Sequence, residues 1–171
     1  MMNRRHFSLS LALAPLLSAC GEAAKTPPVA RDPEASTLCE LDGMQLSDYP
    51  GPKAQLFYEG DAQPHWCCDT VEMFALLLKP EQVKRVAAVY VQDMALADWD
   101  QPRGHWIEAR GAFYVVGSRR HGSMGPTVAS FTSQEQAKAF AAQWGGSALP
   151  FSGVTPQMVD LTGGALHDSH M

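Results

Sequence analysis

The chain has 171 residues, of which 13 are Lys or Arg and 18 are Asp or Glu, giving a formal net charge of −5 at pH 7. This acidic balance argues against the basic surface with which proteins bind nucleic acid or adhere electrostatically to anionic lipid. The length suits one domain, or two small domains packed together.

The N-terminal segment has the layout of an export signal. Arg4-Arg5 precedes an apolar run from Leu9 to Leu17, which is shorter than the ~20 apolar residues that cross a membrane. The run ends in Leu17-Ser-Ala-Cys20, which resembles a bacterial lipobox and implies cleavage before Cys20 and lipidation of its thiol. We therefore expect a signal peptide at 1–19, with an ordinary secretory signal as the alternative. The arginine pair also resembles a twin-arginine signal, so the export route stays open.

The cysteine count predicts at least one thiol with a special role. Residues 20–36 are expected to be the lipidated cysteine and a flexible tether, because they hold three prolines and no apolar periodicity. Three cysteines then remain, Cys39, Cys67 and Cys68, and an odd number in an exported protein cannot pair fully. Burial at a helix start would account for at least one of Cys67 and Cys68, whereas Cys39 lies in a polar context.

A strand-strand-helix-strand pattern is predicted for residues 37–97. Strands at 45–49 and 55–59 flank a Pro-Gly-Pro-Lys turn. Asp69 and Glu72 have the spacing of a capping box, and the helix that they begin is expected to stop at Pro80. A buried strand follows at 86–91.

The same order is predicted again for residues 105–152, after a linker at 98–104. Strands at 105–109 and 112–116 precede a helix with a capping box at Ser133 and Gln136 and a glycine stop at 145–146. A last strand is expected at 147–152 and an irregular tail at 153–171. The fold class is therefore α+β, with two similar ββαβ subdomains packed together.

Two glycine-containing turns carry soft sulfur: Cys39-Glu-Leu-Asp-Gly-Met44 and His121-Gly-Ser-Met-Gly-Pro126. Cu(I) prefers few, soft ligands such as thiolate and thioether, sometimes with imidazole. Cys39, Met44 and Met124 are the leading candidates, and His121 is a possible imidazole donor. Gap-filling by the methionines and an exposed loop histidine are the alternatives. A shared site would form only where the two halves pack together.

A second cluster, His65-Trp-Cys-Cys-Asp69, lacks the Cys-x-x-Cys pair of a structural zinc site. It could be forced into a nucleophilic role, but no nucleophile elbow, Walker loop or dinucleotide fingerprint occurs in the sequence. We therefore expect a protein that is not an enzyme. A thiol enzyme remains the alternative, as does a structural lipoprotein whose sulfur atoms only pack.

The chain resembles the NosL family of nitrous oxide reductase accessory lipoproteins. The resemblance rests on the lipobox, on Cys39-x-x-Asp-Gly-Met44, and on Ser123-Met-Gly-Pro126 followed by Phe131, the helix from Ala137 to Phe140 and two glycines. It implies two ββαβ units with a fold relationship to organomercurial lyase. That relationship is also what makes a thiol enzyme of the organomercurial-lyase type the leading alternative.

The resemblance also implies a function. Members bind Cu(I) in the periplasm and deliver it for the copper centres of nitrous oxide reductase, together with a membrane ABC-type complex. Cys39, Met44 and Met124 become the implied ligands. Asp42 stands where many relatives have a second cysteine, so the site would mix soft and hard donors and could admit a second metal ion. Copper binding is expected to depend on Cys39 and Met124 and to be independent of Cys67 and Cys68.

Overall fold

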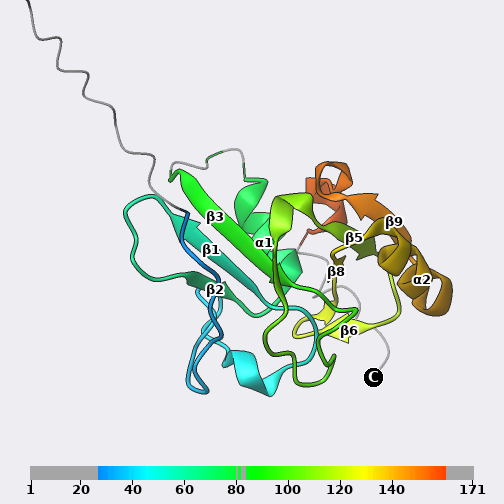
Figure 1. Cartoon of the computed structure of the whole chain (residues 1–171), viewed down its shortest axis with the longest axis horizontal. Helices are drawn as coiled ribbons and strands as arrows, with labels where there is room; N and C mark the ends of the chain where they lie inside the picture. Colours follow the sequence, from blue (N-terminus) through cyan, green and yellow to red (C-terminus); the bar gives the residue numbers. More distant parts are fainter. Residues whose placement is uncertain (1–26, 80, 82–83, 161–171) are drawn as a thin grey trace, which may run out of the picture.

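The computed structural model describes residues 27–79, 81 and 84–160, which form a mixed α/β protein with three sheets and two α-helices (Figure 1). The expected mixture of α and β structure is therefore confirmed. The predicted signal peptide, Cys20 and the end of the predicted tail lie outside the described residues. Within those residues, no helix is both long and apolar enough to span a bilayer.

The first half is built on a four-stranded antiparallel sheet in the order β2-β1-β3-β4. Its strands are β1 (Ala54–Tyr58), β2 (His65–Cys67), β3 (Val86–Gln92) and β4 (Trp106–Glu108). Leu56, Val89 and Val91 are fully buried in the core that this sheet shares with the first helix. Burial of these β-branched and aliphatic side chains is what makes the short strands stable.

The first helix, α1 (Thr70–Leu77), begins where it was predicted to begin. Asp69 is the N-cap and its carboxylate accepts the N–H of Val71. The reciprocal bond of the predicted capping box is not formed, because Glu72 accepts the N–H of Cys68 instead. Glu72 is thus turned into the protein, a point that matters for the site.

The second half has a three-stranded sheet in the order β8-β5-β9, packed on the second helix. Its strands are β5 (Phe113–Val116), β8 (Ala129–Phe131) and β9 (Ser147–Pro150), and a short hairpin of β6 (His121–Gly122) and β7 (Gly125–Pro126) lies between β5 and β8. The helix α2 (Gln134–Trp144) has the predicted capping box and ends at Gly145, whose φ is 80°. The sequence prediction is confirmed here.

Two predicted strands differ from the structure, and four observed strands were not predicted. Residues 45–49 form the 3-10 helix η1 (Leu46–Asp48), because the Gln45 amide bonds the Ser47 and Asp48 side chains and favours a turn. The strands that were not predicted are β2, β6, β7 and β8. The strand predicted at 105–109 exists as β4, but it pairs with β3 and so belongs to the first sheet rather than to the second unit.

Segments outside the two predicted units also pack on the domain. In the described part of the predicted tether, the Pro28 carbonyl accepts the Tyr90 hydroxyl at 2.6 Å, and the Arg31 backbone exchanges two hydrogen bonds with Gln55. After β9, the 3-10 helices η3 (Phe151–Gly153) and η4 (Pro156–Met158) position Val154 and Val159 in the core. These segments are therefore part of the folded domain.

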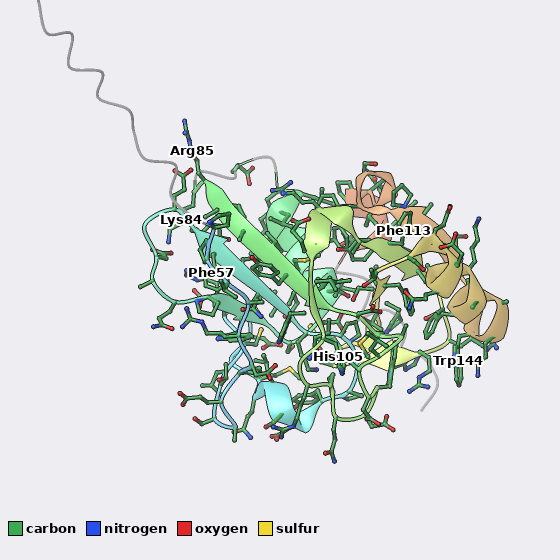
Figure 2. All side chains as sticks on the ribbon, viewed as in Figure 1. Phe57, Lys84, Arg85, His105, Phe113 and Trp144 are labelled. Carbon is green, nitrogen blue, oxygen red and sulfur yellow. The ribbon has the colours of Figure 1, made fainter. Side chains whose placement is uncertain are left out.

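The two halves meet closely at the β6–β7 hairpin. A Cβ on Gly51 would lie 2.8 Å from the Cα of Gly122, so only glycines allow this approach of the backbones. The Trp99 indole also donates to the His121 carbonyl at 3.0 Å. Figure 2 shows Lys84 and Arg85 at the end of the molecule opposite Trp144.

Candidate metal centre

The segment from Cys39 to Met44 forms a tight, internally bonded turn. The Cys39 N–H donates to the Met44 carbonyl at 2.8 Å, and the Gly43 N–H donates to the Cys39 carbonyl at 3.0 Å. Gly43 has a φ of 74°, a left-handed conformation that glycine adopts without steric cost. The Asp42 carboxylate accepts the Met44 N–H at 2.9 Å and so holds the turn closed. This geometry places Cys39 on the inner side of the turn, where it is 4% exposed.

The turn lies along β2, and this contact brings distant cysteines together. The Glu40 N–H donates to the Trp66 carbonyl at 2.8 Å. Cys39 is thereby placed next to Cys68, which joins β2 to α1. One ligand atom from each of four residues lies within 4.8 Å of the others: Cys39, Asp42, Cys68 and Glu72. Asp42 is exposed and the other three are buried, so the cluster opens to solvent on the side of the turn.

Glu72 links the two thiols. Its Oε2 lies 3.1 Å from the Sγ of Cys39, and its Oε1 lies 3.3 Å from the Sγ of Cys68. Burial, followed by the bond with Cys39, raises the pKa of Glu72 to about 8. The bond from the Cys68 thiol lowers the pKa of Cys39 to about 6, and backbone N–H groups act in the same direction. The two shifts favour a Cys39 thiolate, the reactive form toward soft metals, beside a protonated Glu72.

A buried lysine supports the backbone beneath Cys68. The Lys53 ammonium donates to the carbonyls of Tyr49, Pro50 and Cys68 at 2.8 to 3.0 Å, and its side chain is fully buried. Burial lowers the pKa of Lys53, while the neighbouring acids and thiols oppose that effect. A cation at this position stabilises negative charge on the cluster.

The second half contributes to the cluster through the β6–β7 hairpin. The Ser123 hydroxyl lies 3.1 Å from the Sγ of Cys68 and 3.5 Å from the buried Asp69 carboxylate. Thr127, just after the hairpin, donates to that carboxylate at 2.6 Å. Met124 follows Ser123 at the tip of the hairpin and is 43% exposed. The hairpin thus contacts the cluster through Ser123, and the exposed Met124 is the next residue along the chain.

Some of the predicted site residues lie in the cluster, and others lie outside it. Cys39 and Asp42 belong to the cluster, and Met44 packs against the buried group of Cys39, Leu46 and Cys68. His121 is exposed and is not among the ligand-type side chains that gather there.

Sequence reasoning missed Cys68 and Glu72 as members of the cluster. Cys68 lies at its centre, contrary to the expectation that both adjacent cysteines stand apart, whereas Cys67 is buried in the apolar core. The one available signal was that Glu72 stands four residues after Cys68 at the start of a helix. Glu72 was instead interpreted as the partner of Asp69 in a capping box.

The second cluster predicted from sequence is not assembled as a nucleophilic site. The ring nitrogens of His65 face Asp61 at 2.8 Å and Glu40 at 3.3 Å. Asp69 is occupied as a helix cap and by Thr127. Neither residue is positioned to activate a cysteine.

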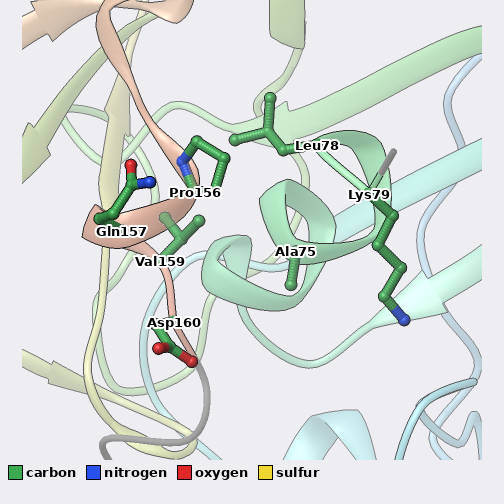
Figure 3. Close-up of a pocket in the computed structure, with 7 residues that line it drawn as sticks. All are labelled: Ala75, Leu78, Lys79, Pro156, Gln157, Val159 and Asp160. Carbon is green, nitrogen blue, oxygen red and sulfur yellow. The ribbon is translucent and has the colours of Figure 1, made fainter. Parts of the chain in front are cut away.

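A separate hollow of about 410 Å³ lies between the last turns of α1 and η4 (Figure 3). No thiol or thioether lines it; its lining residues are Ala75, Leu78, Lys79, Pro156, Gln157, Val159 and Asp160. The concentration of soft donors makes the cysteine cluster, and not this hollow, the candidate site.

Comparison with known proteins gives consistent matches. A family model described as NosL matches residues 30–159. A protein named copper-binding lipoprotein NosL from Achromobacter cycloclastes is 42% identical over 163 residues, which cover 93% of this chain and 84% of the relative. One of the same name from Stutzerimonas stutzeri is 35% identical over 168 residues, with 94% and 87% covered. The crystal structure of the copper chaperone NosL from Shewanella denitrificans has a TM-score of 0.74 at 38% identity, covering 77% of this chain and 99% of that one.

Proposed function

This chain belongs to the NosL family, and we propose that it is a copper chaperone that binds Cu(I) through Cys39, Cys68 and Met44. The observation that carries the proposal is the meeting of two thiols from distant parts of the sequence inside one cluster, with Met44 packed against the buried group that contains them. Two thiolates and a thioether are the donors that favour Cu(I) over harder ions.

The proposed ligand set suits a carrier rather than a permanent site. Cu(I) tolerates two or three ligands, so a sulfur atom of an acceptor protein can enter before the donor ligands leave. A closed four-ligand site would hold the ion instead. Met124 is exposed and follows Ser123, which contacts Cys68, so we propose that its thioether guides the ion during entry or exit. His121 and Asp42 remain candidate ligands after Cys39, Cys68 and Met44. A second metal ion would take the carboxylates of Asp42 and Glu72 as its donors.

The setting of this function is also part of the proposal. Relatives named copper-binding lipoproteins support a lipid anchor, for which Cys20 is the candidate, and a periplasmic location follows from the export signal. We propose that the copper is delivered for assembly of nitrous oxide reductase, together with a membrane ABC-type complex. The finer description of the fold, two similar ββαβ subdomains related to organomercurial lyase, has the same status.

An anaerobic competition titration tests copper binding. The full chain carrying Cys20→Ser, purified in detergent, is titrated against a chromogenic Cu(I) chelator and should remove one equivalent of copper. Cys39→Ser and Cys68→Ser should each weaken binding by more than about tenfold, since each removes a ligand. Cys67→Ser is the matched control for the two thiol variants. Met44→Leu removes the proposed thioether ligand, and Met158→Leu is its matched control. Failure to compete, or equal losses in Cys67→Ser and Cys68→Ser, would contradict the proposed site.

One observation favours a second candidate, a thiol enzyme of the organomercurial-lyase type. The Asp42 carboxylate lies 3.8 Å from the Sγ of Cys68 and within the same cluster as Cys39. Two thiols can hold mercury while a carboxyl group supplies a proton to the departing carbon. Release of benzene from phenylmercury by the reduced protein would support this candidate, and an absence of turnover would remove it.

A further inference from the structure

The two thiols of the proposed copper site also have the arrangement of an exchangeable dithiol. Their Sγ atoms lie within 4.8 Å of each other and face opposite oxygens of one carboxyl group, that of Glu72. A disulfide requires a separation of about 2 Å between the sulfur atoms, so the two atoms must approach each other by less than about 3 Å. The bond from the Glu40 N–H to the Trp66 carbonyl holds the two segments side by side.

The surroundings of the two sulfur atoms differ in a way that suits stepwise exchange. Cys39 lies on a turn whose outer residues, Leu41 to Gly43, are exposed, so displacement of that turn opens its sulfur to a small reagent. Cys68 is fixed from both sides, because its N–H donates to Glu72 and its carbonyl accepts the Lys53 ammonium. Cys39, which lies on the side of the exposed turn, can therefore react first, and Cys68 is in place to react second.

We propose that Cys39 and Cys68 form a reversible disulfide by exchange with a small-molecule disulfide, and that this disulfide prevents copper binding. The inference rests on the proposed function, because it concerns the same two sulfur donors. It makes copper loading conditional on the thiol state of the compartment to which the chain is expected to be exported.

The reaction balances without further reagents. The Cys39 thiolate attacks one sulfur of the small disulfide, forms a mixed disulfide and expels one thiolate. The Cys68 thiol then loses its proton, and its sulfur attacks the Cys39 sulfur and expels the second thiolate, which takes up that proton. Two protein thiols are oxidised to one disulfide, and one small disulfide is reduced to two thiols.

Cys67 supplies an internal control. It is fully buried in the apolar core with Met73 and Phe74, on β2 and one residue from Cys68. A thiol with this environment is inert toward exchange. A reaction governed only by proximity in sequence would involve Cys67 and Cys68, whereas the structure assigns it to Cys39 and Cys68.

The test uses metal-free full chain carrying Cys20→Ser, which retains three thiols, incubated anaerobically with glutathione disulfide. We expect the loss of two thiols and two hydrogen atoms by mass, with no retained glutathione and a Cys39–Cys68 linked peptide after digestion. Cys67→Ser should react in the same way, whereas Cys68→Ser should stop as a glutathione adduct on Cys39. Retention of all three thiols, a stable adduct on the parent chain, or a disulfide that includes Cys67 would overturn the inference.

A second measurement separates this inference from the proposed function. The oxidised protein should bind Cu(I) more than about 100-fold more weakly than the reduced protein, since both thiolate ligands are lost. Copper added beforehand should protect Cys39 and Cys68 from glutathione disulfide. If the reduced protein binds copper but forms no disulfide, only the inference fails. If the disulfide forms but the reduced protein does not bind copper, the proposed function fails.

Discussion

Replacing Asp69 by alanine is expected to destabilise the domain and to loosen the hairpin that adjoins the copper cluster. Asp69 caps α1 through the Val71 N–H and accepts the Thr127 hydroxyl at 2.6 Å while almost fully buried. Loss of an N-cap costs about 1 kcal/mol, and loss of a hydrogen bond to a charged group costs about 2 kcal/mol. Asp69→Ala should therefore lower the free energy of unfolding by about 3 kcal/mol, a large part of the usual total.

The pH dependence of the same group gives a second, independent magnitude. Burial raises the pKa of Asp69 from 3.8 to about 6 in the folded protein. Between these values the folded state binds more protons than the unfolded state, so stability falls as pH rises through this window. A difference of about two pH units corresponds to about 3 kcal/mol. Asp69→Asn retains a capping oxygen and cannot titrate, so its stability should fall less over the same range.

Urea denaturation followed by tryptophan fluorescence at pH 4 and pH 7 measures both effects. Asp100→Ala, at a side chain that is 87% exposed, is the matched control and should change stability by less than about 0.5 kcal/mol. Thr127→Val should reproduce only the hydrogen-bond part of the loss. A loss below 1 kcal/mol in Asp69→Ala, or identical pH dependence in the parent and Asp69→Asn, would refute the reasoning.

Three further predictions concern the packing and charge of the site. In Gly122→Ala the new Cβ would lie 2.9 Å from the Cβ of Thr127 and would also clash with the Asp69 carboxylate. Thermal denaturation should therefore show that the free energy of unfolding falls by more than about 2 kcal/mol. Gly111→Ala is the control, because that position has space for a Cβ, and its stability should hardly change. Lys53→Met leaves three carbonyls without their donor and should destabilise the fold by about 3 kcal/mol in urea, unlike Lys138→Met on the exposed face of α2. The hydrogen bond to Cys39, together with burial, raises the pKa of Cys68, so copper must displace one proton from this thiol. The affinity for Cu(I) should therefore rise about tenfold per pH unit above pH 6. A chelator titration in which the affinity does not change with pH would contradict this.

Local patterns predicted the elements that local forces determine. The cap at Asp69, the capping box of α2 and the buried strand β3 follow from side chains close in sequence, and they are found where they were expected. Residues 45–49 were misassigned because a polar side chain bonding its own neighbours outweighed strand propensity. The partner of β4 could not be foreseen, since pairing depends on contacts made after the chain has folded back.

The candidate site was only half predictable for the same reason. Cys39 was identified from its polar context and from the odd number of cysteines. Its contact with Glu72 spans 33 positions of sequence and depends on the docking of one turn beside β2. Cys68 was hidden by a sound general rule, that adjacent cysteines at a helix start are commonly buried as small apolar groups. Both thiols are indeed buried, but Cys67 lies in the main apolar core, whereas the Cys68 thiol also contacts the Glu72 carboxyl group.

If Cys20 carries the proposed lipid, the docking of the N-terminal segment on Tyr90 limits how far the domain can stand from a membrane. Pro28 is tied to Tyr90, so only eight Cα–Cα steps separate this docked residue from Cys20. Eight fully extended residues span at most about 28 Å. A lipid on Cys20 would therefore hold the domain through a connecting segment no longer than the diameter of a small domain. The part of the first sheet around Tyr90 would then stay near the bilayer, and a receiving protein would have to present its copper site at a matching height.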